Sequence, residues 1–223
     1  MIDFHTHILP NMDDGAKDVS TSLELLNSLE RQNVKLVYLT SHFYPSRESI
    51  EDFLDRRTKS FESLNYKGNL ILKLGCEVHY YNGISQSDNL ASLCLQDTNI
   101  LLLELPFETT INDMMIKEII SLSNRGLRVM LAHIERYNVD ENKIAYLKRN
   151  GILIQSNCEF IIGGLFDHKG IKLLKKGYID VIGTDCHNLD KRKPNYLEAI
   201  NVIKDKIGEE FLEYFIESTS NLI

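Results

Sequence analysis

Residues 100–105 read ILLLEL, four consecutive apolar residues followed by a carboxylate and a further leucine. An uninterrupted apolar run of this length is typical of a strand buried on both faces, as in a parallel sheet covered by helices. Comparable β-branched or apolar runs recur along the chain. We predict strands at residues 2–5, 35–40, 70–77, 100–105, 129–133, 152–156 and 178–184.

Segments with apolar residues at helical spacing lie between these strands. We predict helices at residues 20–32, 48–64, 113–123, 141–149, 170–176, 196–207 and 209–217. Seven β/α units without a break in composition favour one α/β domain over residues 1–223, folded as a (β/α)7-type barrel. An open doubly wound sheet remains the alternative, because periodicity does not prove that the sheet closes.

The composition excludes several classes of protein. Hydrophobic residues make up 43% and charged residues 26% of the 223 residues, which is ordinary for a globular domain. The net charge of −7 argues against nucleic-acid binding as the main function. No apolar run approaches the roughly 20 residues needed to cross a membrane, and no signal peptide is visible, so we expect a cytoplasmic protein. Four cysteines without a C-x-x-C pair indicate reduced thiols.

Histidines and carboxylates follow six of the seven predicted strands. In a barrel all parallel strands end at one face, which is where such folds build their sites. The residues in question are His5, His7 and Asp14 after the first strand, then His42, Glu77, Glu104, His133, Asp185 and His187.

The pair His5 and His7 can face one metal ion, because residues i and i+2 of an extended segment point to the same side. Asp185 and His187 repeat this geometry near the other end of the chain. Each pair alone has a simpler explanation, a polar residue satisfied near a strand end. The same residue types at six equivalent positions favour a metal site built from several strands.

For four other polar residues near these strand ends or elsewhere in the chain, we predict roles other than metal binding. We predict that Asp3 acts locally or orients a ligand histidine, and that Asp13 is a loop or helix-capping residue beside Asp14. His79 and His168 are predicted to lie at the surface.

Residues 186–192, CHNLDKR, fit the C-x5-R pattern of thiol-based phosphatases. That chemistry needs a reactive thiolate in a loop of backbone N–H groups. Here the intervening residues are bulky and charged, and the side chain of Cys186 should point away from the face used by its two neighbours. We therefore assign no catalytic role to Cys186.

Six segments together resemble the PHP (polymerase and histidinol phosphatase) superfamily. They run in order across the whole chain: MIDFHTHILPNMDDGAKD, TSHF, GCEVHYY, ILLLELPFE, VMLAHIERY and VIGTDCHNLDKR. The DDG after H-x-H, the L-x-E-L-P segment and AHIERY resemble more closely the bacterial protein-tyrosine phosphatases that act on the tyrosine kinases of capsule and exopolysaccharide synthesis. This resemblance implies a distorted (β/α)7 TIM-like barrel that binds about three divalent ions.

The resemblance also implies a role for each matching residue. The metal ligands would be His5, His7, Glu77 and Asp185 for the first ion, Glu77, Glu104 and His133 for the second, and Asp14, His42 and His187 for the third. Glu104 and Asp14 stand where many PHP members have histidine. Arg136 resembles the phosphate-contacting arginine of the family, and we assign catalytic roles to Arg136, Glu104 and His42. Arg47 and Glu108 are left as surface residues.

The ligand-type residues predict a metal-dependent phosphoesterase in which a metal-activated hydroxide attacks phosphorus, and the resemblance implies that this enzyme is a protein-tyrosine phosphatase, a phosphoric monoester hydrolase. The resemblance favours Mn²⁺, with Fe or Zn²⁺ as alternatives. The resemblance alone implies the partner, the Tyr-rich tail of a bacterial tyrosine kinase. We expect no nucleic-acid partner and no direct membrane insertion. The alternatives are a small-molecule phosphomonoesterase of histidinol-phosphatase type, a PHP-type nuclease or phosphodiesterase, and a non-catalytic protein with a vestigial site.

Overall fold

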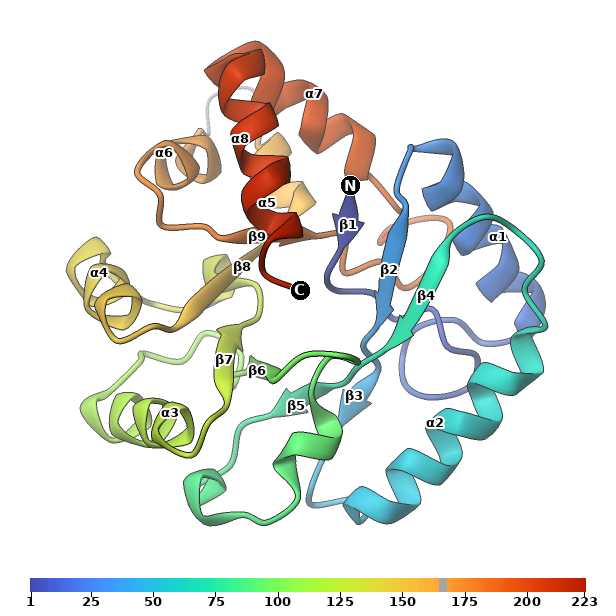
Figure 1. Ribbon diagram of the computed structural model, residues 1–223, viewed down its shortest axis with the longest axis horizontal. Coiled ribbons are helices and arrows are strands. Elements are labelled where there is room, and N and C mark those ends of the chain that lie inside the picture. Colours follow the sequence, from blue (N-terminus) through green and yellow to red (C-terminus); the bar gives the residue numbers. More distant parts are fainter. Residues whose placement is uncertain (165–167) are drawn as a thin grey trace.

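A ring of parallel strands surrounded by helices forms the protein, as a computed structural model of residues 1–164 and 168–223 shows (Figure 1). The strand segments are β1 (Ile2–Asp3), β2 (Leu36–Leu39), β3 (His42–Phe43), β4 (Ile71–Leu74), β5 (Glu77–His79), β6 (Ile100–Glu104), β7 (Arg128–Leu131), β8 (Leu153–Asn157) and β9 (Val181–Gly183). Two short interruptions, at residues 40–41 and 75–76, separate β2 from β3 and β4 from β5. The nine segments therefore follow the seven predicted strand paths.

The strands pair in the orders β1-β2-β4 and β3-β5-β6-β7-β8-β9, and every pair is parallel. The last strand meets the first: Thr6 and Cys186 form a parallel bridge, and the Asp185 N–H donates to the His5 carbonyl at 2.8 Å. The sheet therefore curls until its two ends join. This confirms the α/β barrel-type fold, and the open doubly wound alternative is wrong.

Eight helices are present in the described residues: α1 (Val19–Arg31), α2 (Ile50–Leu64), α3 (Asp113–Asn124), α4 (Glu141–Arg149), α5 (Cys158–Ile162), α6 (Lys169–Lys175), α7 (Tyr196–Ile207) and α8 (Glu209–Ser220). All seven predicted helices are confirmed, with α4 and α7 at the predicted bounds. Helix α5 is additional to the predicted helices. The short 3-10 helices η1 (Ile84–Gln86) and η2 (Leu90–Leu93) follow β5, and η3 (Ile134–Arg136) follows β7.

Capping side chains explain where several of these helices begin. The Asp18 carboxylate accepts a hydrogen bond from the Thr21 N–H at 2.7 Å before α1, and the Asp140 carboxylate accepts one from Lys143 at 2.8 Å before α4. Such caps satisfy backbone donors that a helix leaves free in its first turn. No described helix combines the length and the apolar character needed to cross a membrane.

Alternate residues of each strand face two different apolar cores. On β6, Leu101 and Leu103 belong to the outer core, between strands and helices, while Ile100 and Leu102 belong to the inner core, inside the barrel. The inner core consists of Ile2, Phe4, Leu36, Tyr38, Leu95, Ile100, Leu102, Met130, Ala132, Leu153 and Val181. It fills the half of the barrel toward the amino ends of the strands.

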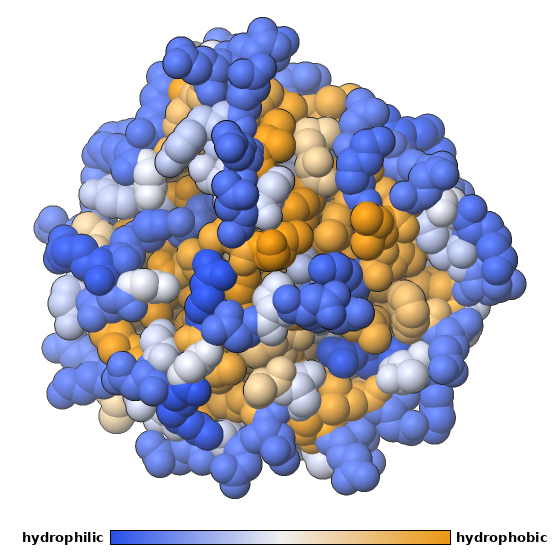
Figure 2. All heavy atoms as spheres, viewed as in Figure 1, coloured by the Kyte–Doolittle hydropathy of each residue, from blue (hydrophilic) through white to orange (hydrophobic). Residues whose placement is uncertain are grey.

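The carboxyl terminus lies over this apolar half, at the centre of the view in Figure 1. Leu222 packs against the inner core, and its carbonyl accepts a hydrogen bond from Arg128 Nη1 at 2.9 Å. Figure 2 shows apolar side chains gathered at the centre of this face, with polar residues on the surrounding helices. The polar residues of the candidate site lie at the opposite end of the barrel, where the strands have their carboxyl ends.

Candidate metal centre

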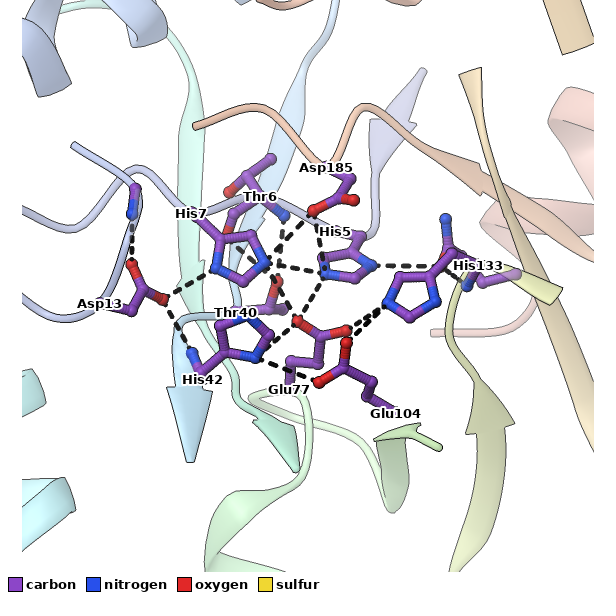
Figure 3. Close-up of polar contacts among 12 residues, drawn as sticks. His5, Thr6, His7, Asp13, Thr40, His42, Glu77, Glu104, His133 and Asp185 are labelled. Carbon is purple, nitrogen blue, oxygen red and sulfur yellow. Dashed lines mark hydrogen bonds and ion pairs between the residues drawn. The ribbon is translucent and has the colours of Figure 1, made fainter. Parts of the chain in front are cut away.

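All nine predicted ligand residues converge at the carboxyl ends of the strands. Ligand atoms within 4.8 Å of one another form three groups: His5, His7 and Glu77; His42, Glu77 and Glu104; and His7, Asp14, His42 and His187. Asp185 and His133 adjoin these groups through contacts with His5, His7, Glu77 and Glu104 (Figure 3).

Two imidazoles and a carboxylate meet at the first group. The Nε2 atoms of His5 and His7 lie 3.0 Å apart, and each lies 3.1 Å from Glu77 Oε2. Asp185 Oδ1 is 3.4 Å from the same nitrogen of His7. Nitrogen and oxygen donors that point at a common centre are the arrangement that a divalent transition-metal ion requires.

Glu77 connects this group to the second one. Its Oε1 lies 2.8 Å from His133 Nε2, and its Oε2 lies 3.0 Å from His42 Nδ1. Glu104 stands beside both histidines, with oxygens 3.4 Å from His133 Nε2 and 3.5 Å from His42 Nδ1. One buried carboxylate thus contacts histidines from three other strand paths, as a bridging ligand would.

The third group is the most open to solvent. Asp14 Oδ1 lies 3.7 Å from His42 Nε2 and 3.4 Å from His187 Nε2. The Asp14 side chain is 63% exposed, whereas that of His187 is buried. Asp14 is therefore more accessible to solvent than its neighbours His42 and His187.

Several buried polar atoms here lack hydrogen bonds within the described part of the chain. They are His42 Nδ1, Glu77 Oε2, Asp185 Oδ1 and His187 Nε2, all at the centre of the cluster. A buried polar atom without a partner costs about 1–3 kcal/mol, so native proteins rarely leave several together. Their close approach without hydrogen-bond geometry fits a site for divalent ions, which would bind these atoms.

Histidines and carboxylates in this cluster shift each other's pKa values. Burial by itself lowers the pKa of His133, but hydrogen bonds with Glu104 and Glu77 raise it to about 9. Burial and the charge of Glu77 raise the pKa of Glu104, while His133 and His79 lower it to about 2. The carboxylates are therefore ionised at neutral pH and available as ligands.

Asp13 lies in the loop after the first strand, as predicted, where its Oδ1 accepts the Gly15 N–H at 3.0 Å. Its Oδ2 lies 2.8 Å from His7 Nδ1 and accepts the His42 backbone N–H at 2.8 Å. A carboxylate on the far nitrogen of a ligand imidazole fixes the ring's orientation and tautomer. Gly15 allows the tight turn that brings Asp13 here, since a Cβ at this glycine would lie 2.1 Å from the His7 carbonyl. The predicted loop position of Asp13 is confirmed, and its contact with His7 is an additional role that the sequence did not indicate.

Strand β8, for which no site residue was predicted, supplies two amide side chains. Gln155 Oε1 accepts the His133 backbone N–H at 2.6 Å and lies 3.1 Å from His5 Nδ1. Asn157 Nδ2 donates to Asp185 Oδ2 at 2.9 Å. Residues 153, 155 and 157 face inward by strand alternation, and this signal could have identified both amides.

Two arginines flank the cluster, and both bind Asp185. Arg136 Nη2 pairs with Asp185 Oδ2, and Arg192 Nη2 lies 2.8 Å from Asp185 Oδ1. Arg192 also approaches Asp14 at 3.5 Å. In the sequence, Arg192 stands out only as the last residue of the C-x5-R pattern. In the structure Cys186 is fully buried and burial raises its thiol pKa, which supports the rejection of a thiol mechanism.

The remaining predictions have mixed outcomes. Asp3 makes the predicted local contact, since its carboxylate accepts the His5 backbone N–H at 3.3 Å, and it also accepts the N–H of the distant Thr184 at 2.9 Å. His168 is exposed, as predicted. His79 is not a simple surface residue: its side chain is only 32% exposed and its Nδ1 lies 3.1 Å from Glu104 Oε2. Arg47 and Glu108 are exposed, as predicted.

Comparison with known proteins places these observations in a family. The profile of the capsular polysaccharide synthesis CpsB/CapC family matches residues 1–223. The chain is 30% identical over 245 residues to tyrosine-protein phosphatase CpsB of Streptococcus agalactiae, covering all of this chain and 98% of that protein. It is 27% identical over 239 residues to tyrosine-protein phosphatase YwqE of Bacillus subtilis, covering all of this chain and 91% of that protein.

Solved structures agree with this assignment. A structure from the work on YwqE of Bacillus subtilis and CpsB of Streptococcus pneumoniae, described as metal-dependent tyrosine phosphatases, superposes with a TM-score of 0.83 at 25% identity. The match covers all of this chain and 94% of that one. A phosphotriesterase from Mycobacterium tuberculosis, at 10% identity and a TM-score of 0.57, shares the fold alone.

Proposed function

Because the chain belongs to the capsular polysaccharide synthesis CpsB/CapC family, we propose that it is a metal-dependent protein-tyrosine phosphatase, a phosphoric monoester hydrolase. The observation that carries this proposal is the meeting of nine histidine and carboxylate side chains at one end of the barrel. Full-length similarity to proteins named tyrosine-protein phosphatases favours phosphotyrosine over a small phosphomonoester as the substrate.

We assign the ligands of about three divalent ions to the three groups, with Glu77 shared between two of them. His5, His7, Glu77 and Asp185 would hold one ion. Glu77, Glu104 and His133 would hold a second, and Asp14, His42 and His187 a third. Mixed nitrogen and oxygen donors suit Mn²⁺, which we favour, or Fe or Zn²⁺. When bound, such ions clamp phosphate oxygens and lower the pKa of a water molecule toward neutrality.

The arginines supply the remaining positive charge. Arg136 and Arg192 converge on Asp185 from η3 and from the loop after β9, so both guanidinium groups face the first ligand group. We assign Arg136 to the nonbridging oxygens of the phosphoryl group, which a planar guanidinium binds through two parallel hydrogen bonds. Arg192 would bind the same phosphoryl group from the side of Asp14. Both contacts would strengthen as charge develops on the phosphoryl oxygens during the transfer to water.

Surrounding side chains keep the ligands in place. Asp13 orients His7, Gln155 holds the His133 backbone, and Asn157 holds Asp185. This support fixes the ligand geometry before the substrate binds, which avoids reorganisation during the reaction. The phenolate of phosphotyrosine is already a fair leaving group, so the site needs no strongly acidic residue beside it.

For the substrate, we propose a phosphotyrosine in the Tyr-rich tail of a bacterial tyrosine kinase. Membership of a capsular polysaccharide synthesis family supports this choice. We place the reaction in the cytoplasm, which is consistent with four buried cysteines that all carry free thiols.

Phosphate release from a phosphotyrosine peptide tests the function. Purified protein should release phosphate with Mn²⁺ and lose this activity with a chelator, and His133→Ala should be inactive under both conditions. A higher kcat/KM for histidinol phosphate than for the peptide would instead support the small-molecule alternative. Activity that persists fully in chelator would contradict the metal-dependent assignment.

A further inference from the structure

An exposed aromatic ring lies on the loop that follows the proposed ligand Glu104. Phe107 is 72% exposed, the highest value among the exposed large apolar side chains of the described residues. It follows the proposed ligand Glu104 by three residues, in the loop that leaves β6 at the functional end of the barrel. Ligand sites are commonly lined by apolar and aromatic side chains around a few polar groups. Phe107 is therefore a candidate to contact a substrate at this end of the barrel.

Backbone hydrogen bonds hold the Phe107 loop against the segment that carries Arg136. The Glu108 N–H donates to the Arg136 carbonyl at 3.2 Å, and the Asn138 N–H donates to the Thr109 carbonyl at 2.9 Å. The loop is thus fixed on the β7 side of Glu104, beside the residue that we assign to phosphate binding. An aromatic ring presented on a fixed loop loses little entropy when a ligand covers it.

A second aromatic side chain stands on the other side of Glu104. The half-buried Tyr44 has its ring centroid 5.0 Å from that of His42 and 5.3 Å from that of His79. The Arg47 guanidinium lies 4.1 Å above the Tyr44 ring, which helps to fix its position. Since His42 and His79 belong to β3 and β5, Tyr44 lies on the β5 side of Glu104.

We propose that Phe107 and Tyr44 form an aromatic entrance that contacts the phenyl ring of the substrate and selects phosphoryl groups carried on an aromatic ring. This inference rests on the proposed function, because it assigns the substrate ring to the same site. The strand order β3-β5-β6-β7 places the two aromatic residues on opposite flanks of Glu104. A phosphoryl group bound at the metal centre and Arg136 would leave its phenyl ring between them.

Binding of two unreactive phosphonates to Mn²⁺-loaded protein tests the entrance separately from turnover. Calorimetry would give dissociation constants for benzylphosphonate and methylphosphonate, which differ in the aromatic ring. The wild type should prefer benzylphosphonate. Phe107→Ala and Tyr44→Ala should each reduce this preference by about two- to tenfold, the range expected for loss of one aromatic contact. Phe107→Tyr should restore it, and Tyr214→Ala, which removes a 67% exposed ring on α8, should leave it unchanged.

Bound Mn²⁺ per chain, measured on the same samples, should be equal in every variant. An unchanged preference in both alanine variants would overturn the inference, as would an absence of preference in the wild type or an equal loss of affinity for both phosphonates. Failure of the proposed function has a different signature: the wild type would prefer benzylphosphonate yet release no phosphate from a phosphotyrosine peptide.

Discussion

The two halves of the barrel interior are built on the same strands with opposite chemistry. Toward the amino ends, Leu102 on β6 and Val181 on β9 contribute to an inner core of apolar side chains. Toward the carboxyl ends, Glu104 and Asp185 continue the same inward-facing positions as charged groups. The apolar half gains stability from burial, whereas the polar half carries buried charge that we expect metal ions to compensate. Stability and function can therefore be altered separately.

The largest effect should come from removing the carboxylate at the centre of the polar half. Glu77→Gln loses the charge that contacts His5, His7, His42 and His133. We expect loss of bound metal and a fall in phosphatase activity on the order of a thousandfold or more, because several kcal/mol of transition-state stabilisation depend on the ions. Elemental analysis and steady-state kinetics would measure both.

Glu213→Gln is the matched control for Glu77→Gln, since Glu213 is an exposed carboxylate on α8. It should keep wild-type metal content and activity. Full metal content in Glu77→Gln would refute the central position that we give to Glu77.

A substitution in the apolar half should lower the stability of the protein without loss of metal. Leu102→Ala leaves a cavity among fully buried side chains, so we expect the free energy of unfolding to fall by about 2–5 kcal/mol. Metal content per folded chain should stay at the wild-type value. Urea denaturation followed by circular dichroism measures the first quantity, and elemental analysis the second. A loss of metal without a loss of stability would show that the two halves are not separable.

Asp13→Asn should have an intermediate effect, confined to the metal centre. It removes the negative charge beside His7 Nδ1, where burial alone lowers the pKa of His7 and Asp13 raises it. Loss of such an orienting carboxylate weakens metal affinity by about 10–100-fold. The control is Asp18→Asn, because asparagine also caps helices well and Asp18 lies outside the cluster. Equal Mn²⁺ affinities for the two variants would contradict the orienting role.

Metal affinity should also depend on pH. His133 must be neutral to bind a cation, and its pKa is about 9 in the metal-free protein. Affinity should therefore rise as pH rises toward 9, by about tenfold per unit for each proton released. Glu104, with a pKa of about 2, stays ionised throughout this range and adds no dependence. Mn²⁺ titrations at several pH values test this, and a constant affinity between neutral pH and pH 9 would count against it.

The smallest effect is expected from Cys186→Ser. Cys186, which forms the parallel bridge with Thr6, has a buried thiol, and its side chain is absent from the ligand groups of the described residues. Activity per bound metal ion should stay close to the wild-type value. Loss of activity in a variant that keeps its metal would revive the thiol mechanism.

Strand periodicity explains which parts of the centre the sequence could reveal. On β6 and β9, inward-facing positions alternate regularly, so Glu104 and Asp185 follow directly from the apolar residues before them. His133 breaks this rule. Its backbone has a positive φ of 30°, which turns its side chain inward although Ala132 already occupies the inward position. Its position at the end of a predicted strand, rather than the alternation of inward-facing residues, identified it.

Contacts between distant loops could not be predicted in this way. Asp13 contacts His7 because the turn at Gly15 brings the loop close to the His7 backbone. Arg192 reaches Asp185 through a loop whose path no local pattern fixes. The fold, in contrast, was predictable in outline, because helix spacing and apolar runs are local features.

The most direct test of the central claim is a titration of metal-free protein with Mn²⁺, with phosphate release from a phosphotyrosine peptide measured at each ratio of bound ion to chain. We predict no activity without metal and full activity at about three ions per chain, the number in the proposed assignment of ligands to the three overlapping groups. Full activity in the metal-free protein would contradict the assignment of this cluster as the catalytic centre.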